Sequence, residues 1–259
     1  MVMIGKIFKI LYIILIILFV VSVFQIRKLP ETTDIARELF NEPIQTETVR
    51  EDFSFTYREK EYYVKPMAGY ELWGLVVTVN NIGAWYNYYH DENTVNLKDV
   101  CVVWGPNIEN GVYRDREIKF NSGEWTCYYQ WSGRLQKKFY PNKLSNNHLL
   151  TANEEIQEII RNVHVGDQIY LKGALVDYTE EGTNWYRKTS LSREDSNQNS
   201  RSGGACEVLY VDEIELLAKN QSGWHLMRFW SKRIFLILLV IHFLIFIIFL
   251  FAKKRYRQN

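Results

Sequence analysis

The sequence predicts two transmembrane α-helices that flank a mainly β domain of the α+β class. Residues 234–252 contain no Asp, Glu, Lys or Arg, and neither do residues 10–24. As a helix, residues 234–252 would span about 28 Å, close to the ~30 Å hydrocarbon core of a bilayer. The region between them contains runs that alternate apolar and polar residues, which is typical of half-buried strands.

The first apolar segment, within residues 1–28, is predicted to be a retained anchor. Lys6 and Lys9 resemble the basic region of a signal peptide, and the apolar core has about the length of one. However, the residues after the core are Gln25-Ile-Arg-Lys-Leu-Pro30, without a small-x-small cleavage site. A retained helix is therefore preferred over a cleaved signal peptide.

Charge is segregated along the chain. All 30 Asp and Glu lie between Glu31 and Glu215, whereas ten of the 31 Lys and Arg lie outside residues 29–231. The middle region thus has 21 basic against 30 acidic residues, a net charge of −9. This balance argues against nucleic acid as its partner, while the basic flanks suit a lipid bilayer. A protein partner or a second copy of the chain is expected instead.

The distribution of basic residues predicts the orientation. At the outer ends of the spans, Lys6 and Lys9 precede the first span and four basic residues follow the second. At the inner ends, Arg27 and Lys28 follow the first span and three more basic residues precede the second. The side richer in Lys and Arg is the cytoplasmic one. We expect an inner-membrane protein with both termini cytoplasmic and the middle domain periplasmic or otherwise extracytoplasmic.

His242 lies nearly midway along the second span. A polar group at that depth suggests a functional site, in contact with Ser22 or Gln25 on the first helix or with a second copy. The alternative is a neutral imidazole satisfied by a neighbouring helix. That alternative is favoured because neither span holds an acid for a proton relay.

The middle region is expected to comprise a polar stalk and a β-rich domain. An amphipathic helix is predicted where Ile156, Ile159, Ile160 and Val163 recur at helical spacing after a capping box of Thr151 and Glu154. Strands are expected at residues 53–57, 62–66, 72–79, 100–104, 116–120, 125–131, 168–178, 186–191, 207–211 and 214–217, with a bulge or bend at Gly173. The expected divisions are an anchor (1–28), a stalk (29–52), the domain (53–218), a membrane-proximal segment (219–233), the second helix (234–252) and a basic cytoplasmic tail (253–259).

Many short strands with one helix before a long late strand resemble an OB-fold barrel, although a β-sandwich or another α+β domain would give a similar pattern. Four stretches are also similar to uncharacterised bacterial membrane-anchored proteins: Tyr70-Glu-Leu-Trp-Gly-Leu-Val-Val77, Leu144-Ser-Asn-Asn-His-Leu-Leu150, Val165-Gly-Asp-Gln-Ile-Tyr-Leu-Lys-Gly173 and Gly204-Ala-Cys-Glu-Val-Leu-Tyr-Val211. This resemblance implies a bacterial origin and carries no activity.

The three cysteines have spacings that match no zinc signature. Cys101 opens the apolar run Cys101-Val-Val-Trp104 and is expected to be a buried thiol, so the predicted disulfide joins Cys127 to Cys206. Three reduced core cysteines are an equally open alternative.

No catalytic residue, metal ligand or cofactor is predicted. A Cys–His hydrolase would need Cys127 with His148 or His164 and Asp177, but no local feature of the sequence activates that thiol. The histidines outside the spans are widely separated and lack the spacing of metal ligands.

Aromatic residues are the remaining candidates for binding. They are expected to stack on a sugar or a peptide side chain, or alternatively to fill and cap a barrel. The candidates are Trp85, Tyr86, Tyr88, Tyr89, Trp185 and Tyr186. The expected function is a membrane-anchored binding or scaffolding protein for a partner protein or envelope component. The alternatives are an envelope hydrolase with dispersed residues and an accessory subunit of a transport or assembly complex that works through His242.

Overall fold

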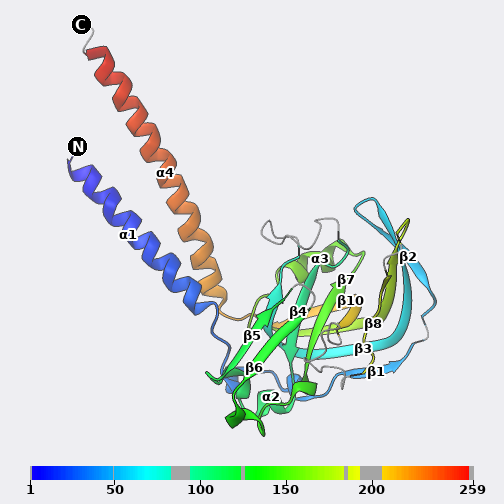
Figure 1. Ribbon diagram of the computed structural model, residues 1–259. Coiled ribbons are helices and arrows are strands. Elements are labelled where there is room, and N and C mark those ends of the chain that lie inside the picture. Colours follow the sequence, from blue (N-terminus) through cyan, green and yellow to red (C-terminus); the bar gives the residue numbers. More distant parts are fainter. Residues whose placement is uncertain are drawn as a thin grey trace. The chain divides into compact units, whose positions relative to one another are not determined.

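The computed structural model describes residues 2–48, 50–82, 94–123, 126–183, 186–192 and 206–256 (Figure 1). Side chains are described from residue 5 to residue 251 within these ranges, except at residue 250. The chain divides into two compact units, one formed by residues 1–28 and 221–259 and the other by residues 29–220. Two apolar helices at the ends therefore flank a mainly β domain, as the sequence predicts.

The helical unit consists of α1 (Val2–Gln25) and α4 (Ser222–Tyr256), which run antiparallel. Both are long and apolar enough to cross a membrane, over Gly5–Gln25 and Ser222–Phe249. The ring centroid of His242 lies 5.3 Å from that of Phe8 and 6.2 Å from that of Tyr12. The expected contact of His242 with Ser22 or Gln25 is wrong, because the antiparallel packing places the middle of α4 against the first half of α1. The Ser22 hydroxyl instead donates to the Phe19 carbonyl, at 2.6 Å.

The separate membrane-proximal segment is not observed either. Helix α4 begins at Ser222 and continues without a break through residues 234–252. The expected boundary at residue 233 reflects a change in side-chain polarity, at Lys232 and Arg233, rather than a change in backbone conformation.

Five strands of the β unit form a ring of pairings. They are β3 (Lys60–Asn80), β4 (Lys98–Val103), β7 (Leu144–Leu150), β8 (Gln168–Glu180) and β10 (Glu207–Ala218). β3 pairs with β4, β4 with β7, β7 with β10, β10 with β8, and β8 with β3 again; only β7 and β10 are parallel. The ring is uneven, since the ladder between β3 and β8 runs from Tyr62 to Leu75 but that between β7 and β10 covers only Asn147 to Leu150.

The remaining elements surround these strands (Figure 1). β1 (Ile44–Glu47) and β2 (Phe53–Tyr57) pair with β3, and β9 (Tyr186–Arg187) pairs with β8. A separate hairpin comprises β5 (Ile118–Ser122) and β6 (Cys127–Trp131). The helical elements are α2 (Pro106–Glu109), α3 (Glu154–Arg161) and the 3-10 turns Thr32–Asp34, Arg37–Phe40, Val112–Arg114, Gly133–Leu135 and Pro141–Lys143.

The domain has two apolar clusters on opposite faces of β3 and β4. Along β4, Val100 and Val102 belong to one cluster, while Cys101 and Val103 belong to the other. Every residue of β4 is therefore buried, and the strand has no solvent-facing side. Burial on both faces explains why this strand reads as a continuous apolar run rather than as an alternating one.

The predicted stalk, residues 29–52, is wrong. Ile35 and Leu39 are buried in the second cluster, and Ile44–Glu47 pairs with β3 as an antiparallel strand. Short apolar side chains in a polar segment bury little surface by themselves, but here they complete a core that the strands provide. The capping box at α3 is also wrong: Asn153 is the N-cap, and its side-chain oxygen accepts from the amides of Glu155 and Ile156.

Candidate functional site

A groove on the outer face of four strands is a candidate binding site among the described residues. It has a volume of about 400 Å³ and is lined by residues of β2, β3, β8 and β9 together with Asp52. Strand register places Ser54, Tyr63, Thr179 and Tyr186 in one row across it. We call this feature the tyrosine groove.

Alternation along the strands decides which side chains face the tyrosine groove. Lys65 and Asp177 are a pair in the register, two residues from the row of Tyr63. Between these rows, Val64 and Tyr178 are buried in the core. Tyr63 and Tyr186 are 48% and 47% exposed. The groove therefore presents two large aromatic rings beside polar and charged groups, a combination that suits peptide and sugar ligands.

Asp177 fixes one side of the tyrosine groove. Its carboxylate is buried and accepts from the Tyr186 hydroxyl at 2.6 Å and from the Thr189 amide at 2.8 Å. The hydrogen bond to Asp177 raises the pKa of Tyr186. Asp177 is thus a hydrogen-bonded structural residue, which orients the exposed Tyr186 ring.

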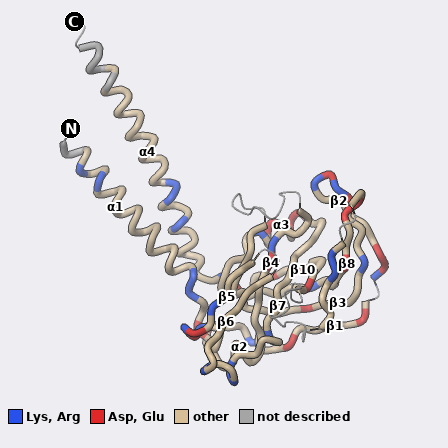
Figure 2. Tube along the Cα trace, in the orientation of Figure 1, with Lys and Arg blue, Asp and Glu red and all other residues tan. Residues whose placement is uncertain are grey.

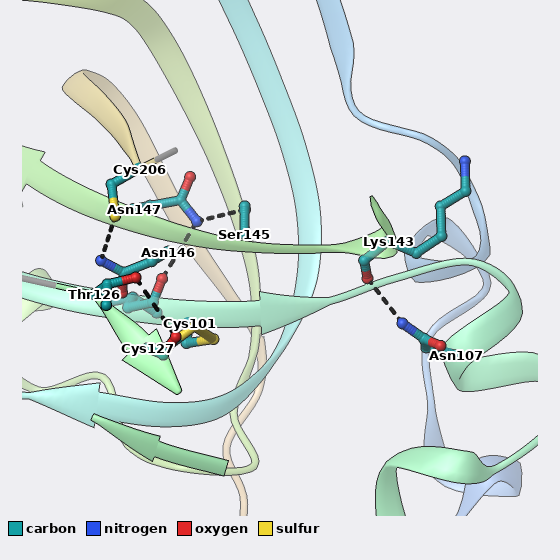
Figure 3. Close-up of a disulfide and its surroundings, with 10 residues drawn as sticks. Cys101, Asn107, Thr126, Cys127, Lys143, Ser145, Asn146, Asn147 and Cys206 are labelled. Carbon is teal, nitrogen blue, oxygen red and sulfur yellow. Dashed lines mark hydrogen bonds between the residues drawn. A yellow bond between two sulfur atoms is a disulfide. The ribbon is translucent and has the colours of Figure 1, made fainter. Parts of the chain in front are cut away.

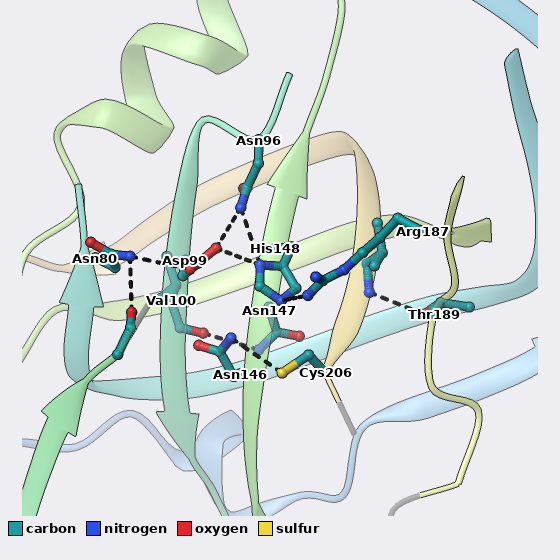
Figure 4. A network of polar contacts seen from close by, with 12 residues as sticks. Asn80, Asn96, Asp99, Val100, Asn146, Asn147, His148, Arg187, Thr189 and Cys206 are labelled. Atoms are coloured by element: carbon teal, nitrogen blue, oxygen red, sulfur yellow. Dashed lines mark hydrogen bonds and ion pairs between the residues drawn. The ribbon is translucent and has the colours of Figure 1, made fainter. Parts of the chain in front are cut away.

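A second polar site, the histidine cluster, lies where β4, β7 and β9 meet the start of β10 (Figure 4). It consists of Asn96, Asp99, His148, Arg187 and Cys206. Nδ1 of His148 lies 2.5 Å from an Asp99 oxygen, and Arg187 contacts Nε2. Asn96 donates to the same Asp99 oxygen at 2.6 Å. Asp99 and His148 are almost fully buried and lie opposite each other on β4 and β7.

Burial and charge act in opposite directions on the two titratable groups at the centre of the histidine cluster. Burial would lower the pKa of His148, but the Asp99 carboxylate and Cys206 raise it, to about 9 overall. Burial would likewise raise the pKa of the Cys206 thiol, but hydrogen bonds with His148, Thr126 and Asn146 lower it below its ordinary value. The pKa of Cys206 is therefore lowered although the residue is buried, because its polar neighbours outweigh the effect of burial.

The structure pairs Cys101 with Cys127, not Cys127 with Cys206 (Figure 3). The Cα atoms of the observed pair are 6.1 Å apart. Cys101 does lie in a buried apolar strand, as expected, but the β5–β6 hairpin covers that strand and brings Cys127 onto it. In the disulfide, Cys127 is not a thiol, so a hydrolase that uses Cys127 as its nucleophile is not assembled.

Of the aromatic candidates, Tyr186 lies in the tyrosine groove. The other five, Trp85, Tyr86, Tyr88, Tyr89 and Trp185, lie outside the described residues.

Sequence reasoning missed Tyr63 of the groove, and it missed Asp99, Asn96 and Arg187 of the histidine cluster. A signal for that cluster was present: Ser145-Asn-Asn-His148 is a polar run between leucines. Polar side chains buried in such a strand need partners, and those partners come from neighbouring strands distant in sequence.

Within the described ranges, no three or more His, Cys, Asp or Glu side chains are grouped so that they could hold a metal ion. Comparisons with protein-family models, curated proteins and solved structures find no match for this chain.

Proposed function

We propose that this chain is a bacterial inner-membrane protein whose β domain lies on the periplasmic side and binds an extended segment of a partner protein. The tyrosine groove is the observation that carries this proposal. The two helices act as anchors, and both termini are cytoplasmic.

Membrane anchoring is supported by the side chains of the helical unit. Apolar residues stay exposed along both helices, for example Ile10 at 57% and Ile248 at 68%. The same unit carries basic but no acidic residues, and the acidic residues are confined to the β unit (Figure 2). Exposed apolar surface of this extent is unfavourable in water and favourable in lipid.

The strand pairings support an OB-fold-like interpretation of the domain. Five strands form the uneven ring, and α3 lies between its third and fourth strands in the chain, β7 and β8. An OB-fold is a five-stranded, partly open barrel. The fold itself carries no function, so the binding proposal depends on the groove.

An extended polypeptide fits the groove because an edge strand borders it. Among the described residues β2 pairs only with β3, so its other edge has backbone groups able to pair with an added strand. Phe53 and Ser54 of β2 also line the groove. A bound segment can thus pair with β2 while its side chains contact Tyr63, and the residues that follow the paired stretch can cross the groove to Tyr186 on β9. Because the middle region as a whole has a net charge of −9, a segment with basic side chains is favoured.

The proposal is tested with a photo-crosslinking amino acid at position 65, in native membranes. We expect a single polypeptide adduct that decreases at least about fivefold when Tyr63→Ala and Tyr186→Ala are combined, since aromatic anchors dominate such interfaces. Tyr128→Ala is the matched control, because Tyr128 is 55% exposed on β6 and lies outside the groove. An adduct whose yield is unchanged by the groove substitutions, or one in which the captured species is a glycan, contradicts the proposal.

A further inference from the structure

Cys206 and the Cys101–Cys127 disulfide lie on either side of Asn146, a residue of β7. Asn146 is directly opposite Cys101 in the β4–β7 ladder, and its side-chain amide donates to the Cys206 sulfur at 3.5 Å. On the hairpin side, Thr126 hydrogen-bonds to Cys206 and immediately precedes Cys127 in the chain. Figure 3 shows Cys206, Asn146 and Thr126 gathered beside the Cys101–Cys127 bond.

We propose that Cys206, His148 and Asp99 form a thiol–disulfide exchange site whose resident substrate is the Cys101–Cys127 disulfide. This inference is independent of the proposed binding function.

The residues around Cys206 match the needs of an attacking thiol. Asp99 at Nδ1 orients the His148 ring and stabilises its charged form. That positive charge near Cys206 favours the thiolate over the thiol. Asn146 donates to the sulfur and favours the thiolate over the thiol. The thiolate is the reactive form in exchange.

The exchange step balances without any added oxidant or reductant. The Cys206 thiolate attacks the Cys127 sulfur, the Cys127–Cys206 bond forms, and the Cys101–Cys127 bond breaks. The electron pair leaves on the Cys101 sulfur, which takes up a proton to become a thiol. One disulfide and one thiol are present before and after.

Strand spacing makes Cys127 the residue that changes partner. Cys101 is on β4, and Cys206 immediately precedes β10, which is separated from β4 by β7. Neighbouring strands are about 4.8 Å apart, so two strand steps place these Cα atoms roughly 10 Å apart. This exceeds the ~7 Å limit for a disulfide. Cys127 belongs to the separate β5–β6 hairpin rather than to this row of ring strands, so the two-strand spacing does not apply to it.

The first test uses the full-length wild-type chain in detergent. Iodoacetamide is added at pH 8, and disulfide-linked and alkylated peptides are then identified by mass spectrometry without reduction. Alkylation of Cys101 traps the exchanged form irreversibly, so we expect a species with alkylated Cys101 and a Cys127–Cys206 link to accumulate with time. The accessibility control is the same chain reduced with dithiothreitol, in which Cys101 is expected to be alkylated within the same time. Absence of the exchanged species when Cys101 of the reduced chain is alkylated overturns the proposal, and no substitution is needed for this result.

The second test uses variants to identify the base. His148→Gln is expected to slow the appearance of that species at least about tenfold, because the thiolate fraction falls. His164→Gln is the control, since the His164 side chain is 47% exposed outside the histidine cluster. In Cys101→Ser, oxidised glutathione is expected to link Cys127 to Cys206. If a folded Cys101→Ser chain keeps both thiols, or if His148→Gln exchanges at the wild-type rate, the assignment is wrong.

Discussion

Single buried polar residues in this domain are held by partners from distant parts of the chain. Lys98 is an example: its ammonium group is buried and donates to the carbonyls of Arg161 and Val163, at 2.6 and 2.8 Å. Burial lowers the pKa of Lys98 to about 8. These carbonyls lie at the end of α3, where backbone acceptors lack partners within the helix. Lys98, which no sequence pattern distinguishes from the other lysines, thus connects β4 to the end of α3 through these hydrogen bonds.

The raised pKa of His148 predicts a pH dependence of stability. A group with a folded-state pKa of about 9, above its ordinary value of 6.5, contributes stability that is complete below pH 6.5 and is lost as the pH rises through 9. We expect the stabilisation that His148 provides over His148→Gln to fall by about 1 to 2 kcal/mol between pH 6 and pH 9.5. This is less than the full shift gives, because both chains carry Cys206→Ser, which removes one of the partners that raise the pKa of His148. Chemical denaturation of the full-length chain in detergent, followed by tryptophan fluorescence, measures this difference.

Both chains in that comparison carry Cys206→Ser. This background is needed because the lowered pKa of Cys206 contributes stability that grows as the pH rises, with the opposite sign. Groups that titrate elsewhere cancel between the two chains. A difference that stays constant across this range would show that Asp99 does not hold the imidazolium form.

At the scale of elements, close backbone approach constrains the long strands. Gly173 on β8 faces the β10 bulge, where the register shifts between Val211 and Glu213. A Cβ atom at Gly173 would lie 2.0 Å from the Tyr210 carbonyl oxygen. The sequence predicts an irregularity at Gly173, and the structure places the bulge on the opposite strand.

Gly173→Ala is therefore expected to destabilise the domain by about 3 kcal/mol or more, since backbone rather than a flexible side chain must move. Gly133→Ala is the control, because nothing lies within 4 Å of its added Cβ and its φ is not positive. We expect that change to stay within about 0.5 kcal/mol of wild type. Equal unfolding midpoints for the two variants would contradict the close packing of β8 against β10.

At the scale of the whole molecule, charge predicts orientation. The helical unit has no acidic residue. Slightly more of its basic residues lie near the two termini than at the inner ends of the spans. We expect a fluorescent protein fused to either terminus to lie in the cytoplasm and to fluoresce there. External protease added to spheroplasts is expected to cleave the β domain.

Two proteins of known location, one in the cytoplasm and one outside the membrane, serve as controls for that experiment. Fluorescence from only one terminal fusion would contradict two retained spans. Survival of the domain while the external control is digested, together with its digestion in inverted vesicles, would reverse the proposed orientation.

Much of the architecture follows from local pattern. The hairpin of β2 and β3 is predicted by its alternating aromatic residues, and it turns through Arg58 and Glu59, both with positive φ. The hairpin of β5 and β6 and the helix α3 are predicted by the same kind of evidence. By contrast, the predicted stalk contributes β1 to the sheet, because one short strand is too weak a signal without the β3 edge that pairs with it.

The sequence by itself determined the two apolar end helices, the segregation of charge and the β-rich middle, because each depends on composition or on a short period along the chain. Only the tertiary structure decided which cysteines pair, which acid contacts His148 and which tyrosines share a groove. Those contacts depend on strand register between segments that lie more than a hundred residues apart in the case of β3 and β8, and a one-residue slip would turn each side chain to the other face.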